Sequence, residues 1–171
     1  YIDIVSKLMM SSDLNAILSE ISSRTGNLFA AIVMSGKILT ISSPFYVDYP
    51  LWMHSAQQGY CHEIVMDYIE ARRRTSCAPK GSVPFSLYCG KINMYILCTR
   101  IIRGHDLLGC FFAINRNPHF DNQTKRLIPL IVQRLKDSIL RLKSANNYSS
   151  IMQNNILLDA VAGATPTETR L

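Results

Sequence analysis

Several residue patterns that mark enzyme and metal sites are missing from this sequence of 171 residues. It contains no HExxH, no CxxC and no GxSxG, which removes the usual sequence signs of a zinc protease, a zinc ribbon and a serine hydrolase. Its eight glycines occur in neither GxGxxG nor P-loop spacing, so no phosphate-binding loop is indicated. We therefore expect no catalytic residues, no metal site and no cofactor that a motif requires.

Long hydrophobic runs and paired cysteines are missing as well. The longest apolar runs, such as Leu107–Ile114, are far shorter than the ~20 residues of a membrane-spanning helix, and no signal peptide is recognisable. Five cysteines are an odd number, and at least three stand inside apolar, strand-like segments. This usage indicates free, buried thiols in a reducing compartment. The sequence thus predicts a soluble, cytoplasmic protein without a membrane partner.

The charge is moderately positive, at +6 with 18% charged residues. Such a balance permits contact with nucleic acid but does not establish it. The basic residues are scattered apart from residues 72–74, which lie near an expected helix end, where cations suit the helix dipole. No aromatic residues interleave with these arginines, as a single-strand platform would require. We expect no DNA contact by this chain itself.

Apolar periodicity and turn residues predict an alternation of helices and short strands. Helices are predicted over residues 2–10, from a cap at Ser12 or Asp13 to Gly26, and over 51–58, 61–74, 121–144 and 151–161. Strands are predicted over residues 28–34, 37–42, 85–89, 93–102 and 107–114. Pro129 predicts a late start or a kink in the helix capped by Asp121, and Asn146-Asn147 predicts an interruption after it.

The turns between these strands constrain the sheet. Most are too short for parallel crossovers, so the five strands should form a largely antiparallel sheet. The strands are apolar at both alternating phases, with Ile96 and Cys98 on one side and Tyr95 and Leu97 on the other. Both faces should therefore be covered. We predict an α+β protein with the N- and C-terminal helices on one face and residues 44–74 as a helical cover on the other.

The end of this predicted sheet resembles a known family. The stretch "LLGCFFAINRN", followed by "HFDNQTKRLIPLIVQRLKDSIL", is similar to the last strand and last helix of GAF-like sensor domains, which are relatives of PAS domains. Gly109, Phe120 and Asp121 occupy the family's glycine, phenylalanine and helix-cap positions. The resemblance covers nearly the whole chain, but it depends on element order and apolar spacing and includes no catalytic signature.

A narrower resemblance concerns PucR/CdaR-type bacterial transcription regulators. "SSDLNAILSEISSRTGNLFAAIVMSGKILTISS" looks like the start of their sensor region, and "NNILLDAVAGATPTETRL" resembles the helix after it. This implies an N-terminal helix over 1–11, a sensor domain over 12–146, and a connecting helix and linker over 147–171. The implied function is small-molecule sensing in a homodimer that signals through its terminal helices. A DNA-binding module would follow Leu171.

The predicted cover holds the candidate ligand site, because four aromatic residues stand within eight positions there. Aromatic walls with a few polar tips suit a small-molecule pocket between a cover and a sheet. Core filling is the alternative for each ring, and the sequence does not name the ligand. The candidate ligand-binding residues are Phe45, Tyr46, Trp52, Tyr60, Cys61, Tyr88 and Tyr95, with Tyr49 among the aromatic residues of the cover.

Three other interpretations remain open. Some GAF domains attach a linear tetrapyrrole through a Cys-His pair, and Cys61-His62 stands in about that place without the surrounding chromophore motifs. A GAF-like enzyme acting on a small thiol or sulfoxide would need a reactive cysteine. A ligand-free dimerisation module would use part of the last helix together with Ile2, Val5 and Met9.

Overall fold

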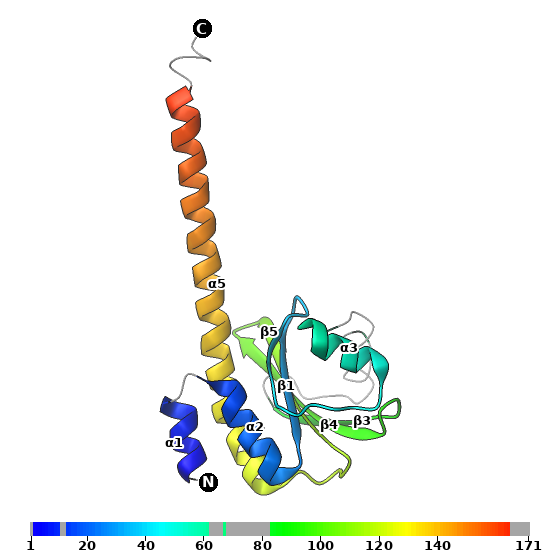
Figure 1. Ribbon diagram of the computed structural model, residues 1–171. Coiled ribbons are helices and arrows are strands. Elements are labelled where there is room, and N and C mark those ends of the chain that lie inside the picture. Colours follow the sequence, from blue (N-terminus) through cyan, green and yellow to red (C-terminus); the bar gives the residue numbers. More distant parts are fainter. Residues whose placement is uncertain (1, 11–12, 62–66, 68–82, 165–171) are drawn as a thin grey trace. The chain divides into compact units, whose positions relative to one another are not determined.

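The structure, a computed structural model, describes residues 2–10, 13–61, 67 and 83–164, with most side chains up to residue 146. It is an α+β fold with an open five-stranded antiparallel sheet, as predicted, and the described part contains four helices (Figure 1). The helices are α1 (Ile2–Met10), α2 (Leu14–Thr25), α3 (Pro50–Gln58) and α5 (Asn122–Ala164). The strands are β1 (Leu28–Val33), β2 (Ile38–Ile41), β3 (Phe85–Cys89), β4 (Met94–Arg103) and β5 (Asp106–Asn115).

The strand order is β2-β1-β5-β4-β3, and every neighbouring pair is antiparallel. Two hairpins, β1–β2 and β3–β4, therefore flank β5. The tight turns that the sequence predicted are present: Gly36 and Gly104 adopt positive φ values of 93° and 60° in the β1–β2 and β4–β5 turns. The central pairing is β1 with β5, which are far apart in the chain.

Gly109 permits this central pairing. It stands opposite Val33 in the β1–β5 register. A Cβ atom placed on Gly109 would lie 2.2 Å from the backbone oxygen of Ile32, a distance that no real contact allows. The obstacle is backbone rather than a flexible side chain, so the neighbour cannot yield without moving the strand. Gly109, one of the residues that carry the family resemblance, is thus required because the backbones of β1 and β5 lie too close together there for a side chain.

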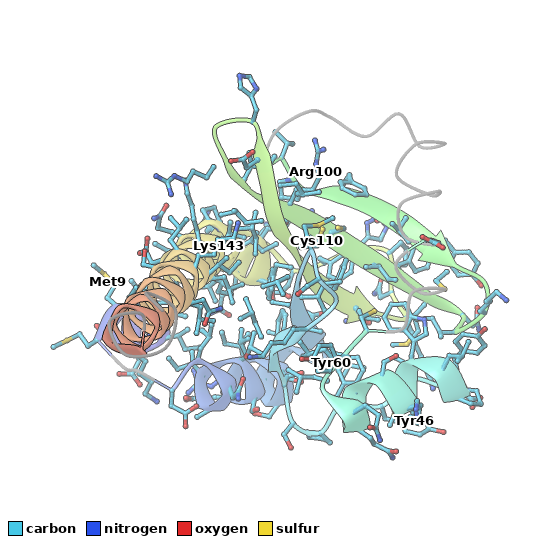
Figure 2. The ribbon with its side chains drawn as sticks, turned by 90° about the horizontal axis from the view of Figure 1, so that it is seen from above. Met9, Tyr46, Tyr60, Arg100, Cys110 and Lys143 are labelled. Atoms are coloured by element: carbon cyan, nitrogen blue, oxygen red, sulfur yellow. The ribbon has the colours of Figure 1, made fainter. Side chains whose placement is uncertain are left out.

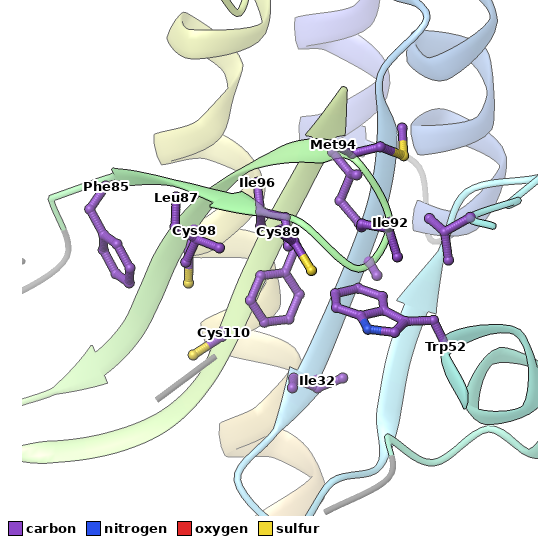
Figure 3. Packing of buried hydrophobic residues seen from close by; sticks show 14 residues of the cluster. Ile32, Trp52, Phe85, Leu87, Cys89, Ile92, Met94, Ile96, Cys98 and Cys110 are labelled. Carbon is purple, nitrogen blue, oxygen red and sulfur yellow. The ribbon is translucent and has the colours of Figure 1, made fainter. Parts of the chain in front are cut away.

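The cover face of the sheet, which we define as the face that packs against α3, carries one large apolar cluster. Alternate residues of the strands point to it, as the period-2 pattern of a strand requires. Figure 3 shows Trp52 reaching from α3 towards this face, where three cysteines also lie. Its buried sheet and turn members are Ala30, Ile32, Phe85, Leu87, Cys89, Ile92, Met94, Ile96, Cys98, Cys110, Phe112 and Ile114.

The opposite face, the helix face, packs against α2 and the start of α5, and α1 lies beside these helices (Figure 1). The rings of Phe29 and Phe111 stack there with centroids 5.8 Å apart. The helices contribute buried side chains to the same layer: Ile17, Leu18 and Ile21 from α2, and Leu127, Ile128, Ile131 and Leu135 from α5. The predicted arrangement of terminal helices on one face is confirmed. The predicted cover is confirmed for α3, while residues 62–66 and 68–74 lie outside the described residues.

Predicted helix ends are mostly confirmed. The Asp13 carboxylate accepts a hydrogen bond from the Ala16 amide at 3.1 Å, and Gly26 ends α2 with a φ of 75°. The predicted interruption at Asn146-Asn147 is wrong, because α5 continues to Ala164. Asparagine costs a helix well under 1 kcal/mol relative to alanine, which is not enough to break it. Pro129 lies inside α5, so the late start is also wrong.

A buried asparagine, Asn27, links the adjacent ends of the two central strands, β1 and β5, to the start of α5. Asn27 is fully buried, and its amide nitrogen donates to Asp121 Oδ1 at 3.1 Å and to Thr124 Oγ1 at 3.0 Å. Its amide oxygen accepts from Asn115 at 2.6 Å. Asp121 in turn caps α5 by accepting from the Thr124 amide at 2.8 Å. This network fixes the start of α5 to the ends of β1 and β5.

The chain forms two compact units, Tyr1–Lys136 and Asp137–Leu171. The first contains the whole sheet, and the second contains the remainder of α5. The predicted division into segments 1–11, 12–146 and 147–171 stays a prediction. Among the described residues, no helix has the length and apolar character that crossing a bilayer requires.

Because the β1 backbone lies so close to Gly109, adding a single methyl group at this position should lower the stability of the protein strongly. Gly109→Ala should destabilise the protein by about 1–3 kcal/mol or more, because the β1 backbone must move away from β5. Gly90→Ala is the matched control, since its Cβ would lie 3.8 Å from the Tyr88 ring, an ordinary contact. Urea unfolding of both variants measures the difference. Equal stabilities for the two variants would contradict this account.

The cap of α5 predicts a pH effect. Desolvation raises the pKa of Asp121, but hydrogen bonds from Thr124 and Asn27 outweigh it and hold the pKa below its usual value of 3.8. The stabilisation is therefore present above pH 3.8 and is lost as pH falls through the lower, folded-state pKa. Asp121→Asn, which keeps a good cap residue, should show a smaller loss of unfolding free energy between about pH 5 and pH 2.

Asp48→Asn is the control, because Asp48 is an exposed carboxylate outside this network. It should reproduce the acid response of the unmodified protein. Chemical unfolding across this pH range provides the measurement. An unchanged acid response in Asp121→Asn would show that the carboxylate is not held by the network.

Candidate functional site

The α3 helix lies across one face of the sheet, and its two ends contact the turns of the β1–β2 and β3–β4 hairpins. After α3, the amide of Cys61 donates to Gly36 O at 2.6 Å and that of Ile38 to Gly59 O at 2.8 Å, which ties this end to the β1–β2 turn. Before α3, the Tyr49 ring lies 5.5 Å from the ammonium of Lys91 in the β3–β4 turn. Such a cation–π contact contributes about 0.5–1 kcal/mol at an exposed site. The cover is thus held at both ends by turns, with Trp52 inserted between them.

An apolar cavity lies between α3 and the sheet. It has a volume of about 30 Å³. Among the described lining residues, polar side-chain atoms come from Ser55, Cys61 and the indole nitrogen of Trp52. The other lining residues are Ala30, Ile32, Ile38, Ile41, Phe45, Trp52, Ala56 and Phe112. Such a wall favours an apolar group over a charged one, because a charge would lose its hydration without gaining a partner.

The size of the cavity limits what it holds in this conformation. A volume of about 30 Å³ exceeds the ~10–15 Å³ that one water needs, but drug-sized ligands occupy pockets of ~300–1,000 Å³. A metabolite therefore enters only if α3 and its flanking segments move outward from the sheet.

Cys61 is the one ionisable group among the described lining residues. Burial raises the pKa of its thiol from 9.0 to about 11. At neutral pH the thiolate is then roughly 100-fold scarcer than in an ordinary cysteine, and the thiolate is the reactive form. The cysteine behaves as part of an apolar wall rather than as a nucleophile. Cys89, Cys98 and Cys110 are buried, as predicted, and Cys77 lies outside the described residues.

Three of the seven candidate residues meet at this cavity. Phe45, Trp52 and Cys61 all line it, although they come from the loop before α3, from α3 itself and from the segment after it. Trp52 is only 8% exposed and Phe45 is half-buried. The structure thus brings together residues that the sequence grouped by aromatic density.

Tyr46 and Tyr60 lie at the surface instead. Tyr46 is 63% exposed and Tyr60 59% (Figure 2). Tyr46 follows Phe45 directly, and in extended chain neighbouring side chains point to opposite sides. Tyr60 forms an isolated β-bridge with Lys37, which fixes its backbone. Neither residue is part of the cavity wall, so their inclusion in the pocket is corrected.

The placement of Tyr88 and Tyr95 in the same cavity is also corrected. They are direct cross-strand partners in β3 and β4, and their ring centroids are 5.0 Å apart. Their neighbours Leu87, Cys89 and Ile96 belong to the cluster on the cover face. Because side chains alternate along a strand, both tyrosines lie on the helix face.

Sequence reasoning missed the small residues that make the cavity possible. Ala30 of β1 and Ala56 of α3 both line it, and Ser55 of α3, which also lines it, is 95% buried. A search for aromatic residues does not find them, because their contribution is the space they leave. The available signal was alternation in β1, which places Ala30 and Ile32 on one face.

Metal and tetrapyrrole interpretations gain no support. Within the described ranges, no group of three His, Cys, Asp or Glu side chains is placed to bind a metal ion. His54 is exposed on α3, and His62 lies outside the described residues. The Cys61-His62 pair is therefore described only at Cys61, which packs into the apolar wall.

Comparison with known proteins adds no family assignment. No family model matches the sequence, and a search of curated proteins finds no match. The functional argument therefore depends on the sheet order, the α3 cover and the cavity beneath it.

The raised pKa of Cys61 predicts slow alkylation. Iodoacetamide at neutral pH should modify Cys61 at least tenfold more slowly than a free cysteine, and the rate should keep rising as pH increases towards 11. Peptide mapping by mass spectrometry separates Cys61 from the other cysteines. Urea-unfolded protein is the control and should react at the ordinary rate. Rapid modification of folded protein at neutral pH would contradict the buried position.

Proposed function

We propose that this chain is a small-molecule-sensing regulatory domain of GAF-like architecture. The observation that carries the proposal is the apolar cavity between α3 and a five-stranded antiparallel sheet of order β2-β1-β5-β4-β3. Terminal helices cover the other face, so the two faces of one sheet have different partners. This division suits a sensor, because ligand and output contact the same strands from opposite sides.

In this proposal the ligand presents an apolar group to the cavity and shifts α3 away from the sheet. A ligand changes a conformational equilibrium only through different affinities for the two states. The displaced contacts are those of Trp52 and Phe45, and the ties at both ends of α3 limit the movement to the cover.

The route to the output runs through β5. Phe112 lines the cavity, and the neighbouring Phe111 stacks on Phe29 on the helix face. At the end of the same strand, Asn115 donates to Asn27, which holds Asp121 at the cap of α5. A shift of β5 therefore acts on the first turn of α5. Coupling of this kind typically amounts to 1–3 kcal/mol.

We further propose that the signal is passed on in a cytoplasmic homodimer of a PucR/CdaR-type transcription regulator, whose DNA-binding module lies outside this sequence. The resemblance of the β5–α5 segment and of the α2–β2 segment supports this assignment. Met9 and Met10 are 75% and 87% exposed at the end of α1, which is consistent with a partner surface near the terminal helices (Figure 2).

The enzyme alternative has less support. Thiol or sulfoxide chemistry needs an accessible cysteine with a low pKa. Cys61 has a raised pKa, and Cys89, Cys98 and Cys110 are buried. We therefore propose that the chain has no catalytic activity.

Native mass spectrometry of freshly purified protein tests the sensor proposal. We expect a small-molecule adduct that dissociates on mild heating. Ala56→Leu should remove the adduct, because the larger side chain fills the cavity. Gln57→Leu is the matched control: it adds a leucine at the exposed neighbouring position of α3 and should retain the adduct.

A bare dimer in all three samples would contradict sensing and favour the ligand-free dimerisation module. An adduct that survives in Ala56→Leu would place the ligand elsewhere and overturn the assignment of this cavity.

A further inference from the structure

A second recess lies on the helix face, away from the α3 cavity. It is a groove of about 230 Å³ between the start of α5 and the edge of the sheet. Thr99 and Ile102 of β4 form one wall, and Ile128, Val132 and Lys136 of α5 form the other, with Pro84 at one end. All of these residues belong to the first compact unit.

A polar group that the fold leaves unsatisfied lies within one wall of the groove. Thr99 is 2% exposed, and its hydroxyl oxygen has no hydrogen-bond partner among the described residues. Burial of a hydroxyl without a partner costs about 1–3 kcal/mol. The oxygen itself is covered, and rotation about χ1, which exchanges the hydroxyl and methyl positions, is the movement that presents it to the groove. A group bound in the groove would offset the cost.

Charge distinguishes this groove from the cavity under α3. Among the described lining residues Lys136 alone carries a formal charge, and it forms no ion pair with another described residue. Apart from Gln133 and Thr99, the other described lining residues are apolar: Pro84, Ile102, Ile128, Pro129 and Val132. A lysine, an apolar middle and a buried hydroxyl together match a small organic anion with a hydrogen-bonding group away from its charge.

We propose that this groove is a second ligand site, which binds a small organic anion directly between β4 and the start of α5. The anionic group pairs with Lys136, the body packs on the apolar walls, and the other polar group bonds to Thr99. The site is independent of the cavity under α3. Because one wall is α5 itself, occupancy stabilises one position of that helix on the sheet without movement of the cover.

The test uses 4-hydroxybenzoate, which has a carboxylate and a hydroxyl at opposite ends of a small ring. Isothermal titration calorimetry of the full chain should show saturable binding. Benzoate lacks the distal hydroxyl and should bind about tenfold more weakly. The neutral amide 4-hydroxybenzamide should bind several-fold more weakly and lose the salt dependence.

Variants assign the contacts. Lys136→Gln should weaken 4-hydroxybenzoate several-fold, whereas Lys125→Gln, an exposed position on the same helix, should leave it unchanged. Thr99→Val should weaken it about tenfold, with an unchanged or higher melting temperature of the free protein. Ala56→Leu, which fills the cavity under α3, should have no effect on this binding.

Several results would overturn the proposal. No binding of 4-hydroxybenzoate up to its solubility limit would remove the site. Equal affinity in Lys136→Gln and the unmodified protein, or loss of binding in Ala56→Leu, would place the anion elsewhere. A lowered melting temperature of free Thr99→Val would show that the hydroxyl is already satisfied. None of these outcomes removes the adduct expected under α3, so this proposal can fail while the sensor proposal stands.

Discussion

The pairing of β1 with β5 is the contact on which the rest of the structure depends. It joins two hairpins into one sheet and brings the strand after α2 beside the strand before α5. Both helices then cover the same face. Gly109 allows the approach, and the Asn27 network closes one end of it with hydrogen bonds to Asn115 and Asp121. Without this pairing there is neither a helix face nor a cover face.

The two faces of the sheet are held by different kinds of contact. On the helix face, stacked phenylalanines and the buried stripes of α2 and α5 form a continuous apolar layer. On the cover face, the nine residues of α3 depend on Trp52 and on ties to two turns. Small residues leave a cavity there. Regions with fewer buried contacts open at lower free energy than the core, so the cover is the element suited to respond to a ligand.

Much of the fold could be predicted from the sequence, because its signals are local. Glycine turns, alternating strands and the caps at Asp13 and Asp121 depend on neighbouring residues alone. The alternation of side chains along β4 also indicates that Tyr95 and Ile96 face opposite sides of the sheet. Tyr95 was nevertheless predicted to line the pocket, because it is aromatic. The place of the cavity between cover and sheet was predicted, but its size and small lining residues were not, since Ala30 and Ala56 are far apart in the chain. The continuation of α5 through Asn146-Asn147 was missed because two weak helix formers were treated as a break.

Native-state hydrogen exchange tests the central claim, that α3 opens from the sheet while the strands stay paired. The account predicts that amides of α3 exchange through a partial opening, at a free energy well below that of β1, β4 and β5, whose amides exchange only on global unfolding. If the α3 amides instead exchanged only on global unfolding, with the same free energy as the amides of β5, the claim would be contradicted. The α3 helix would then be a fixed part of the core, and no ligand could enter beneath it.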